Sequence, residues 1–496
     1  MSRQTSVHDL ESLVQSYHSL IVVETVEEER VRSIVMEVAT RLQAPMVEWS
    51  ISDGLRRRSG TTLEGTKDAL SMLQRIDEIH ERDSLYLLKD LGPHLQHPNV
   101  VRLLRDLVTR AAATHSAIVL TGDPVELPRD IDGLAVRYEL QLPDQNEIRE
   151  VIRQVVDSIS ARKQIRVDLS RDDAHRLVRA LSGLTLSQVR SAVARAILED
   201  EALTVADIDR IVRGKGEIIQ RAGVLEFFPI EGNNFQLGGF GRLKGWLEQA
   251  RIGFTPEAKA LNLTPPKGLL LVGVQGCGKS LAAKFIAREW QLPLLKLDAG
   301  RLYDKYVGES EKNFRKATAL AEAMAPVVLW IDEIEKAFAQ GGTNDADGGL
   351  SQRLFATFLT WLQEKKKEVF VVGVANDLSK LPPELLRKGR FDEIFFVDLP
   401  DDEERRNIVS IHLRLRKQDP AAFDLPRLAA ASNGFSGAEI EQAVISALYR
   451  SLHRKERLST DVLLNGLSST VPLSVTRGEE IAELRAAAVG RFTPVR

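Results

Sequence analysis

Cysteine is almost absent from this chain of 496 residues, in which Cys277 is the only one. A lone cysteine excludes an intrachain disulfide and agrees with a reducing compartment. No apolar run approaches the roughly 20 residues that a membrane-spanning helix needs. The first residues also lack the charged and then apolar pattern of a secretory signal. The sequence therefore predicts a soluble, cytoplasmic protein that does not enter a membrane.

A marked excess of either charge is missing as well. The 67 lysines and arginines face 70 aspartates and glutamates, which leaves a net charge of −3. Binding to nucleic acid through its phosphates favours a basic surface, so this balance does not call for such a partner. Hydrophobic residues make up 43% and charged residues 28%, as in an ordinary globular protein, and the length predicts two to four domains.

The segment from Gly273 to Ser280 reads Gly-Val-Gln-Gly-Cys-Gly-Lys-Ser, the spacing of a Walker A phosphate-binding loop. It follows the apolar run 269–272 and precedes a segment with helical spacing, as this motif requires. Glycines let backbone N–H groups face phosphate oxygens, and the helix N-terminus adds positive potential. Lys279 is placed to reach the β- and γ-phosphates, and the Ser280 hydroxyl to bind magnesium. The predicted nucleotide-binding residues of this loop are Gly273, Gln275, Gly276, Cys277, Gly278, Lys279, Ser280 and Leu281.

Two further apolar strands end in polar residues. Residues 327–331 lead into Asp332 and Glu333, the form of a Walker B motif. Asp332 would hold the magnesium ion through water, and Glu333 is placed to polarise the attacking water. Residues 369–374 lead to Asn376, whose amide can orient that water against the γ-phosphate. Together these motifs predict hydrolysis of ATP with Mg²⁺ as the metal cofactor.

The first half of the chain has the pattern of a similar sheet without this chemistry. Strands are predicted at 19–23, 45–49, 84–90 and 117–122 with helical segments between them, which favours a parallel α/β sheet. The place of a phosphate loop, residues 24–29, holds four glutamates and neither glycine nor lysine. Carboxylates there would repel a triphosphate, so we expect no nucleotide in this half.

An internal repeat connects the two halves. The turn 142–144, Leu-Pro-Asp, recurs at 399–401, and residues 177–197 align without a gap on residues 428–448. Two amphipathic helices can look alike by chance, but the order of the strands, the Leu-Pro-Asp turn and the helical tail all agree. We infer a duplicated module whose first copy lost its nucleotide chemistry.

The Walker motifs and Asn376, together with residues 385–392 and 434–439, resemble the AAA subfamily of ring ATPases. This resemblance implies an α/β fold, a doubly wound parallel sheet with a phosphate loop and a helical lid. It also implies a homo-oligomeric ring, expected to be hexameric. The repeat adds a degenerate AAA-like α/β module in front.

The same resemblance assigns roles to residues outside the Walker motifs. Arg387 and Arg390 match the arginine fingers that reach the γ-phosphate held by a neighbouring subunit. Gly437 and Ala438 match the second sensor region, which closes over the nucleotide from the lid. Gly238 matches the backbone that lies next to the adenine.

Residues 301–311 resemble the aromatic–hydrophobic–glycine pore loop of AAA proteins that thread polypeptides. Tyr306, followed by Val307, would offer a flat apolar face in the central channel to grip a side chain of any type. The alternative is that Tyr306 packs in the core. The glycine-rich acidic stretch 340–349 is interpreted as a second channel loop or as an ordinary disordered loop.

Over nearly its whole length, the chain is similar to the AAA proteins encoded by conserved open reading frames of cyanobacterial and red-algal plastid genomes. Plastid stroma is therefore the expected location if the gene lies in a plastid. The expected regions are a degenerate AAA-like module at 1–220, a connector at 221–240, an ATPase core at 241–400, a lid at 401–465 and a C-terminal helix and tail at 466–496.

Three functions agree with these motifs. The first is a ring ATPase that remodels or threads an unidentified protein partner. The second is a switch whose partner binding is controlled by ATP, which the sequence does not separate from the first. The third is a ring acting on nucleic acid. It is disfavoured because Tyr306-Val307-Gly308 is typical of polypeptide threading and no basic aromatic stretch lines a predicted channel.

Overall fold

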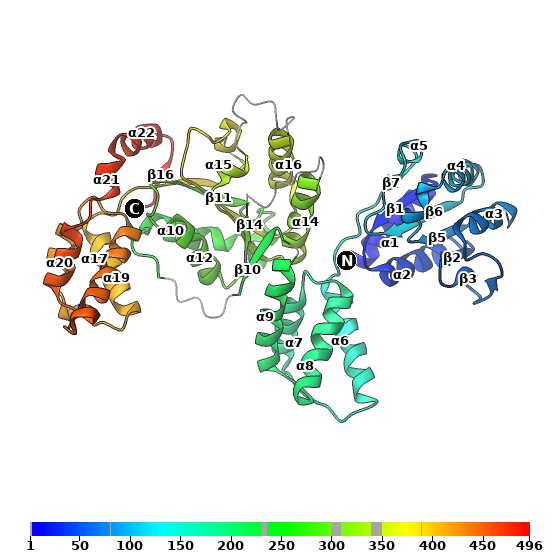
Figure 1. The fold of residues 1–496 in the computed structure, drawn as a ribbon, viewed down its shortest axis with the longest axis horizontal. Coiled ribbons are helices and arrows are strands. Elements are labelled where there is room, and N and C mark those ends of the chain that lie inside the picture. Colours follow the sequence, from blue (N-terminus) through cyan, green and yellow to red (C-terminus); the bar gives the residue numbers. More distant parts are fainter. Residues whose placement is uncertain are drawn as a thin grey trace. The chain divides into compact units, whose positions relative to one another are not determined.

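The computed structural model divides the chain into two compact units, Met1–Ile211 and Val212–Arg496, which Figure 1 follows from blue to red. The residues that it describes are 2–79, 81–221, 223–229, 236–298, 309–338, 350–387 and 389–496. Within these ranges, no helix is both long enough and apolar enough to cross a membrane.

A seven-stranded sheet forms the centre of the first unit, in the order β4-β3-β2-β5-β6-β1-β7. Its strands are β1 (Leu20–Glu24), β2 (Met46–Ser50), β3 (Gly54–Arg57), β4 (Thr62–Leu63), β5 (Leu85–Lys89), β6 (Ala117–Gly122) and β7 (Val136–Arg137). A small parallel sheet pairs β8 (Arg166–Asp168) with β9 (Ala202–Thr204). The helices are α1 (Ser2–Gln15), α2 (Glu28–Arg41), α3 (Ala69–Ile79), η1 (Gly92–Gln96), α4 (Pro98–Ala113), α5 (Arg129–Asp132), α6 (Gln145–Ser160), α7 (Arg171–Leu181), α8 (Leu186–Asp200) and α9 (Val205–Arg221), the last of which crosses the boundary between the units.

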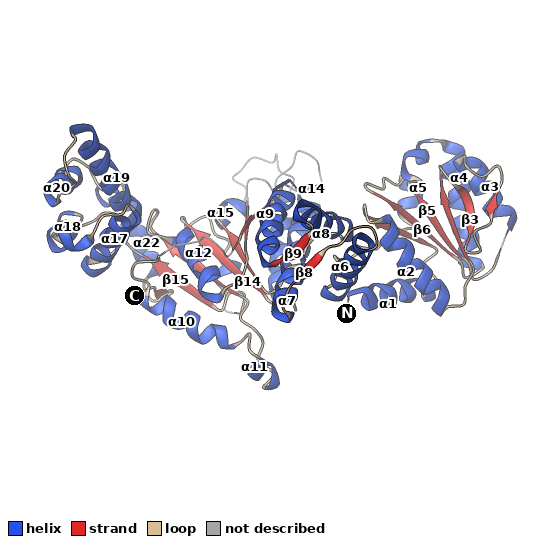
Figure 2. Cartoon of the chain, turned by 90° about the horizontal axis from the view of Figure 1, so that it is seen from below, coloured by secondary structure: helices blue, strands red, loops and turns tan. Residues whose placement is uncertain are grey.

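The parallel strands of this sheet are buried on both faces because their residues alternate between two apolar layers. On β1, Leu20 and Val22 face a core shared with α3 and α4, whereas Ile21 and Val23 face a core shared with α1 and α2. Figure 2 shows helices on both sides of the sheet. Such cover on both faces explains why these strands are continuous apolar runs in the sequence.

The second unit is built on another seven-stranded sheet, in the order β10-β12-β13-β14-β11-β15-β16. Its strands are β10 (Leu225–Phe228), β11 (Gly268–Gly273), β12 (Leu294–Leu297), β13 (Val327–Ile331), β14 (Val369–Ala375), β15 (Glu393–Val397) and β16 (Thr493–Pro494). The helices of the core are α10 (Gly241–Ile252), α11 (Pro256–Ala260), α12 (Lys279–Trp290), α14 (Glu309–Ala323), α15 (Ile334–Ala337), α16 (Leu350–Glu364) and η3 (Pro383–Leu386). Those that follow are α17 (Asp402–Leu415), η4 (Pro420–Ala422), α18 (Leu425–Ala431), α19 (Gly437–Arg454), α20 (Thr460–Ser468), α21 (Leu473–Thr476) and α22 (Gly478–Ala488).

The two sheets share one central topology. In chain order, the five strands β1, β2, β5, β6 and β7 lie in the spatial order 2-3-4-1-5, and so do β11 to β15. On β11, Leu270 and Val272 face a core with α14 and α16, and Leu269 and Leu271 face one with α10 and α12. The same alternation of apolar residues thus builds both sheets, as the internal repeat predicts.

The helical segments repeat as well. Residues of α17, α18, α19 and α20 form a separate apolar cluster, which corresponds to the predicted lid. Two helix starts in each unit that correspond in the repeat carry a capping box, in which an N-cap side chain and the third helical residue bond to each other's backbone. The four pairs are Asp144 with Glu147, Thr185 with Gln188, Asp401 with Glu404 and Ser436 with Glu439. These caps stand at aligned positions of the repeat.

Two short strands join the second sheet from segments that the sequence analysis placed outside it. β10 lies within the predicted connector and pairs antiparallel with β12. β16 lies within the predicted C-terminal tail and pairs in parallel with β15. Each is an edge strand of a few residues, so local alternation of apolar residues is too short to reveal it.

Candidate functional site

A cavity of about 710 Å³ lies in the second unit at the carboxyl ends of β11, β13 and β14. Ligands of open α/β sheets bind at this edge, and the volume is typical of a small-molecule site. Of the residues predicted from the sequence, the cavity is lined by Gly238, Gln275, Gly276, Cys277, Gly278, Lys279, Ser280, Leu281, Asp332, Glu333, Asn376, Gly437 and Ala438. Gly273, Arg387 and Arg390 are not among its lining residues.

The phosphate loop depends on its glycines. Gly273 has a φ of +149°, and a Cβ there would lie 2.0 Å from the carbonyl oxygen of Val397. Gly276 and Gly278 have φ values of +77° and +89°, in the left-handed region that favours glycine. The loop is therefore shaped as the motif predicts, with β15 packed directly against its first residue.

Lys279 is buried beside this loop, with 4% of its surface exposed. Its Nζ donates to the carbonyl oxygens of Gly273 at 2.7 Å and Val274 at 2.8 Å. Burial lowers the pKa of Lys279 to about 8. Both acceptors are neutral, so a phosphate oxygen with a formal charge would be a stronger partner for the ammonium group.

Ser280 and Asp332 form an oxygen pair suited to magnesium. The Ser280 Oγ donates to Asp332 Oδ1 at 3.3 Å, and Lys296 Nζ lies 3.7 Å from Asp332 Oδ2. In the part of the chain that the structure describes, no group of three or more His, Cys, Asp and Glu side chains could hold a metal. Mg²⁺ is usually held by one or two carboxylates together with phosphates and waters, so this donor set fits it.

Glu333, which follows β13 and precedes α15, has a strained backbone conformation. Its φ is +49°, which is uncommon for a residue other than glycine and is often found where a side chain serves a function. Its carboxylate lies 2.8 Å from Lys336 Nζ. Nearby, the Glu335 carboxylate accepts the N–H of Asn376 at 3.0 Å, and burial raises the pKa of Glu335. Glu335 thereby fixes Asn376 next to the predicted acids, a contact that the sequence analysis did not identify.

The lid contributes to the cavity through two helices. At the start of α19, the N–H of Ala438 donates to the carbonyl of Gly276 at 3.0 Å. A Cβ on Gly276 would lie 3.0 Å from Ser436 Oγ, so the loop and the lid are in close contact. The residues that the sequence analysis missed, mostly at the apolar end, are Gln236, Leu237, Phe240, Val397, Asp398, Pro400, Glu404, Ile408, Ile411, His412, Leu415, Glu441 and Val495.

A helical pattern could have revealed part of this apolar end. The positions 408, 411, 412 and 415 follow the i, i+3, i+4, i+7 spacing, so they share one face of α17. That face is directed at the cavity and supplies an apolar wall. Such a wall is suited to a flat apolar group such as a nucleobase.

Three groups of predicted residues are not brought together in the cavity. Arg387 is exposed, and the Nη1 of Arg390 is buried with no hydrogen-bond partner in the described part of the chain. Tyr306 and Val307 lie outside the described residues, as does the stretch 340–349.

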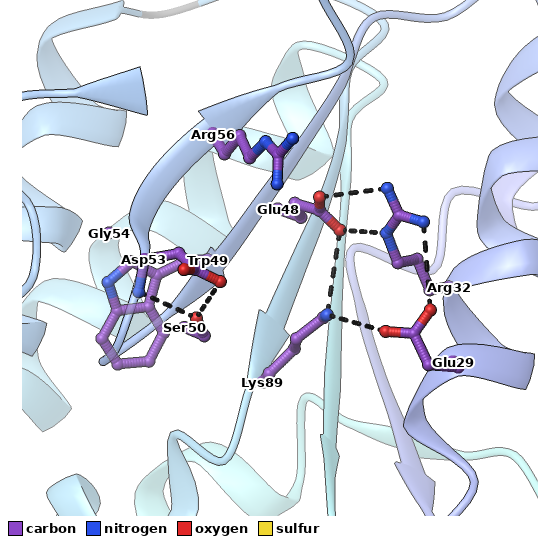
Figure 3. Close-up of a pocket in the computed structure, with 9 residues that line it drawn as sticks. All are labelled: Glu29, Arg32, Glu48, Trp49, Ser50, Asp53, Gly54, Arg56 and Lys89. Atoms are coloured by element: carbon purple, nitrogen blue, oxygen red, sulfur yellow. Dashed lines mark hydrogen bonds and ion pairs between the residues drawn. The ribbon is translucent and has the colours of Figure 1, made fainter. Parts of the chain in front are cut away.

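The first unit has a smaller cavity of about 240 Å³ at the corresponding edge of its sheet (Figure 3). Its lining residues are Glu29, Arg32, Glu48, Trp49, Ser50, Asp53, Gly54, Arg56 and Lys89. Arg32 Nε donates to Glu48 Oε2 at 2.6 Å, and Lys89 Nζ lies 3.8 Å from the same oxygen. Acidic and basic side chains therefore neutralise each other here.

Models of known protein families match residues of both units. The model of the "ATPase family associated with various cellular activities (AAA)" matches residues 269–399, and the AAA+ lid domain matches residues 422–463. The N-terminal domain of SpoVK-like AAA ATPases matches residues 6–140, and their second domain matches residues 146–222. These matches confirm the predicted fold class in both halves of the chain.

Four relatives that match nearly the whole chain carry the name "uncharacterized AAA domain-containing protein ycf46". The chain is 36% identical to that of Trieres chinensis over 97% of its own length and 96% of the relative's. It is 37% identical to that of Guillardia theta over 96% and 94%, and 35% identical to that of Pyropia yezoensis over 96% and 96%. The predicted resemblance is confirmed, and the chain belongs to the AAA family of ATPases, within the group that these ycf46 proteins represent.

Proposed function

We propose that the protein hydrolyses ATP with Mg²⁺ as a ring of identical chains and uses this hydrolysis to remodel or thread a protein partner. The observation that carries the proposal is the cavity that joins the phosphate loop, the acids after β13, Asn376 and the lid helix α19. The proposed location is the cytoplasm or a plastid stroma, where a lone cysteine stays reduced.

The chain's own residues divide the work of hydrolysis. The loop N–H groups and Lys279 hold the triphosphate, while Ser280 and Asp332 would hold the metal. Bound magnesium would neutralise charge on the phosphate oxygens. Glu333 takes a proton from the attacking water, and Asn376 orients that water. The left-handed backbone of Glu333 and the hydrogen bond that the Asn376 N–H donates to Glu335 support these placements.

The proposed ring is supported by the two predicted arginine fingers, which are absent from the residues that line the cavity. Arg387 and Arg390 do not line the cavity of their own chain, and Arg390 has a buried Nη1 without a partner among the described residues. A guanidinium that reaches a neighbour's γ-phosphate stabilises charge in the transition state. Threading of the partner is supported by the resemblance of Tyr306 and Val307 to a pore loop.

Replacing Glu333 with glutamine tests the hydrolytic part. Glu333→Gln should retain ATP but release phosphate at least about 10²-fold more slowly, because the general base is lost. Glu289→Gln, the same change at an exposed position of α12, serves as the matched control. Light scattering of Glu333→Gln with ATP measures the ring. Normal turnover, or a monomer at all concentrations with ATP bound, would refute the proposal.

Replacing Tyr306 with alanine tests the action on the partner, once that partner is captured with Glu333→Gln. Tyr306→Ala should hydrolyse ATP at nearly the normal rate and lose the remodelling of the partner, because the aromatic face grips by burying apolar area. A folded, assembled variant that remains fully active on the partner would replace threading with the nucleotide-switch function.

A further inference from the structure

Residues after β16 form part of the cavity. Val495 continues the pairing of β16, because its N–H donates to the carbonyl of Phe396 at 3.2 Å. Its own carbonyl accepts the N–H groups of Arg242 at 2.9 Å and Leu243 at 3.4 Å. The Val495 side chain is 3% exposed and lines the cavity. One residue thus connects the edge of the sheet to the first turn of α10.

The first turn of α10 depends on that carbonyl. N–H groups in the first turn of a helix have no partner within the helix, and no side chain caps α10. The N-cap residue, Phe240, has a φ of +63°, a conformation that costs energy for a residue with a side chain. Phe240 lines the cavity together with Leu237 and Gly238. Val495 therefore supports the turn that forms this end of the cavity.

Arg496 connects the same segment to the lid. Its guanidinium donates to the carbonyl of Leu399 and lies 3.5 Å from the Asp401 carboxylate and 3.7 Å from the Glu404 carboxylate. Asp401 and Glu404 form the capping box that begins α17. Glu404 lines the cavity and packs on the preceding loop, since a Cβ on Gly239 would lie 2.2 Å from its Oε1.

We propose that Val495 and Arg496 are positioning residues for the nucleoside part of ATP. Val495 caps α10 and so sets the loop of Leu237 to Phe240, and Arg496 holds the start of α17, whose apolar face forms the facing wall. Arg496 acts through other residues, whereas Val495 supports the loop and also lines the cavity, and both lie away from the phosphate motifs. Their loss therefore changes nucleotide affinity more than the chemical step. This inference rests on the proposed function, because it takes the cavity as the ATP site.

The test compares substitutions at Arg496 in the full chain. Arg496→Gln should raise the KM for ATP about tenfold, with kcat changed by no more than about twofold. Affinity for inorganic tripolyphosphate, which has no nucleoside, should stay unchanged in competition binding. Arg496→Lys should raise the KM less than Arg496→Gln does, because lysine keeps the positive charge. It should still raise the KM, because one ammonium group cannot reach all three acceptors. Arg491→Gln is the matched control, an exposed arginine of the same segment with no side-chain partner in the described part of the chain.

The outcomes distinguish a failure of this inference from a failure of the proposed function. If the wild type binds ATP more tightly than tripolyphosphate and Arg496→Gln behaves like Arg491→Gln, the inference fails while the proposed function stands. If the wild type binds both equally, the cavity does not hold a base and the proposed function fails first. A fall in melting temperature and in kcat without a change in ATP affinity would show a merely structural role and overturn the inference.

Discussion

Helix α12 of the second unit begins with Lys279 and Ser280, whereas helix α2 of the first unit begins with Glu28 and Glu29. The third central strand in chain order, β13 in the second unit and β5 in the first, ends differently as well. β13 leads into Asp332 and then Glu333, whose φ is +49°, and β5 ends on Lys89 before Asp90, whose φ is +50°. Aligned on these left-handed residues, Lys89 takes the place of Asp332.

The neighbouring strand completes an inversion of charge. In the second unit, Lys296 of β12 lies 3.7 Å from Asp332, whereas Glu48 of β2 lies 3.8 Å from Lys89 (Figure 3). Lys89 Nζ also lies 2.7 Å from Glu28 Oε1. The strand order is the same in both sheets, so the buried apolar alternation maintains the fold while a few side chains at the sheet edge set the chemistry.

Helices α6, α7 and α8 of the first unit, which correspond to the lid helices of the second and are called the first lid, are held by different contacts from that lid. In the second unit, a backbone N–H of α19 bonds to the carbonyl of Gly276. At the aligned place in the first unit, the N–H of Leu186 donates to Glu27 Oε1 at 2.6 Å. Arg30 is buried and bonds both oxygens of Glu147, at 3.0 and 3.1 Å, and Glu27 Oε2 at 3.3 Å. In the first unit, the carboxylates of Glu27 and Glu147 thus make the contacts at the place where the second unit has its phosphate loop.

The largest expected difference between the units is in ATP binding. Lys279→Ala should abolish it, because the lysine is the cation of the phosphate loop, and Glu28→Ala at the aligned position should leave it unchanged. Nucleotide retained per chain is counted in the Glu333→Gln background. Two ATP molecules per chain would show that the first unit also binds nucleotide and would contradict the expected difference between the units.

Arginines after the fourth central strand should differ nearly as much. Arg390→Ala should lower the hydrolysis rate about 10³-fold and leave ATP binding nearly intact. In the first unit, Arg137 is bound to Glu24 at 2.6 Å and Asp132 at 2.9 Å of its own chain, so Arg137→Ala should leave the rate unchanged. Phosphate release per chain, measured at several protein concentrations, should rise with concentration in the wild type. Full activity in a concentration-independent monomer would contradict a finger that acts on a neighbour.

The buried ion pairs at the first lid predict an effect on stability. Arg30→Met should destabilise the first unit by about 3–5 kcal/mol, because it removes the guanidinium that pairs with the buried carboxylates of Glu27 and Glu147. Arg41→Met on the same helix removes solvent-accessible pairs with Glu37 and Glu11 and should cost less than about 1 kcal/mol. Hydrogen exchange of α2 and α6 in the full chain measures both. Equal protection in the two variants would show that the buried pairs do not hold this lid.

The smallest expected effect is on pH dependence. Burial lowers the pKa of Lys279 to about 8, and bound phosphates favour its charged form, so its pKa is higher in the complex. Above pH 8, binding must take up a proton, and ATP affinity should fall by up to about tenfold per pH unit, whereas below pH 8 this term is constant. Lys279→Arg stays charged and should remove this dependence. Affinity titrations from about pH 7 to 9.5 decide it, and a flat wild-type profile would rule it out.

Short local patterns in the sequence predicted most of the candidate site residues. The phosphate loop, the acids after β13 and Asn376 were predicted because each follows an apolar strand directly, so a few consecutive residues contain the signal. The roles of these residues, and those of Arg387, Arg390, Tyr306 and Val307, stay predictions. The repeat was visible because two copies of one pattern reinforce each other.

The sequence by itself thus determined the α/β class of both units, the family and the residues of the phosphate loop. Only the tertiary structure decided what faces the other end of that cavity and what closes the first lid. Val495 meets Arg242, and Arg30 meets Glu147, 117 residues away, across sheet edges and helix starts. Parallel strands bring such distant segments to one edge, and a contact between them leaves no periodic pattern in either segment.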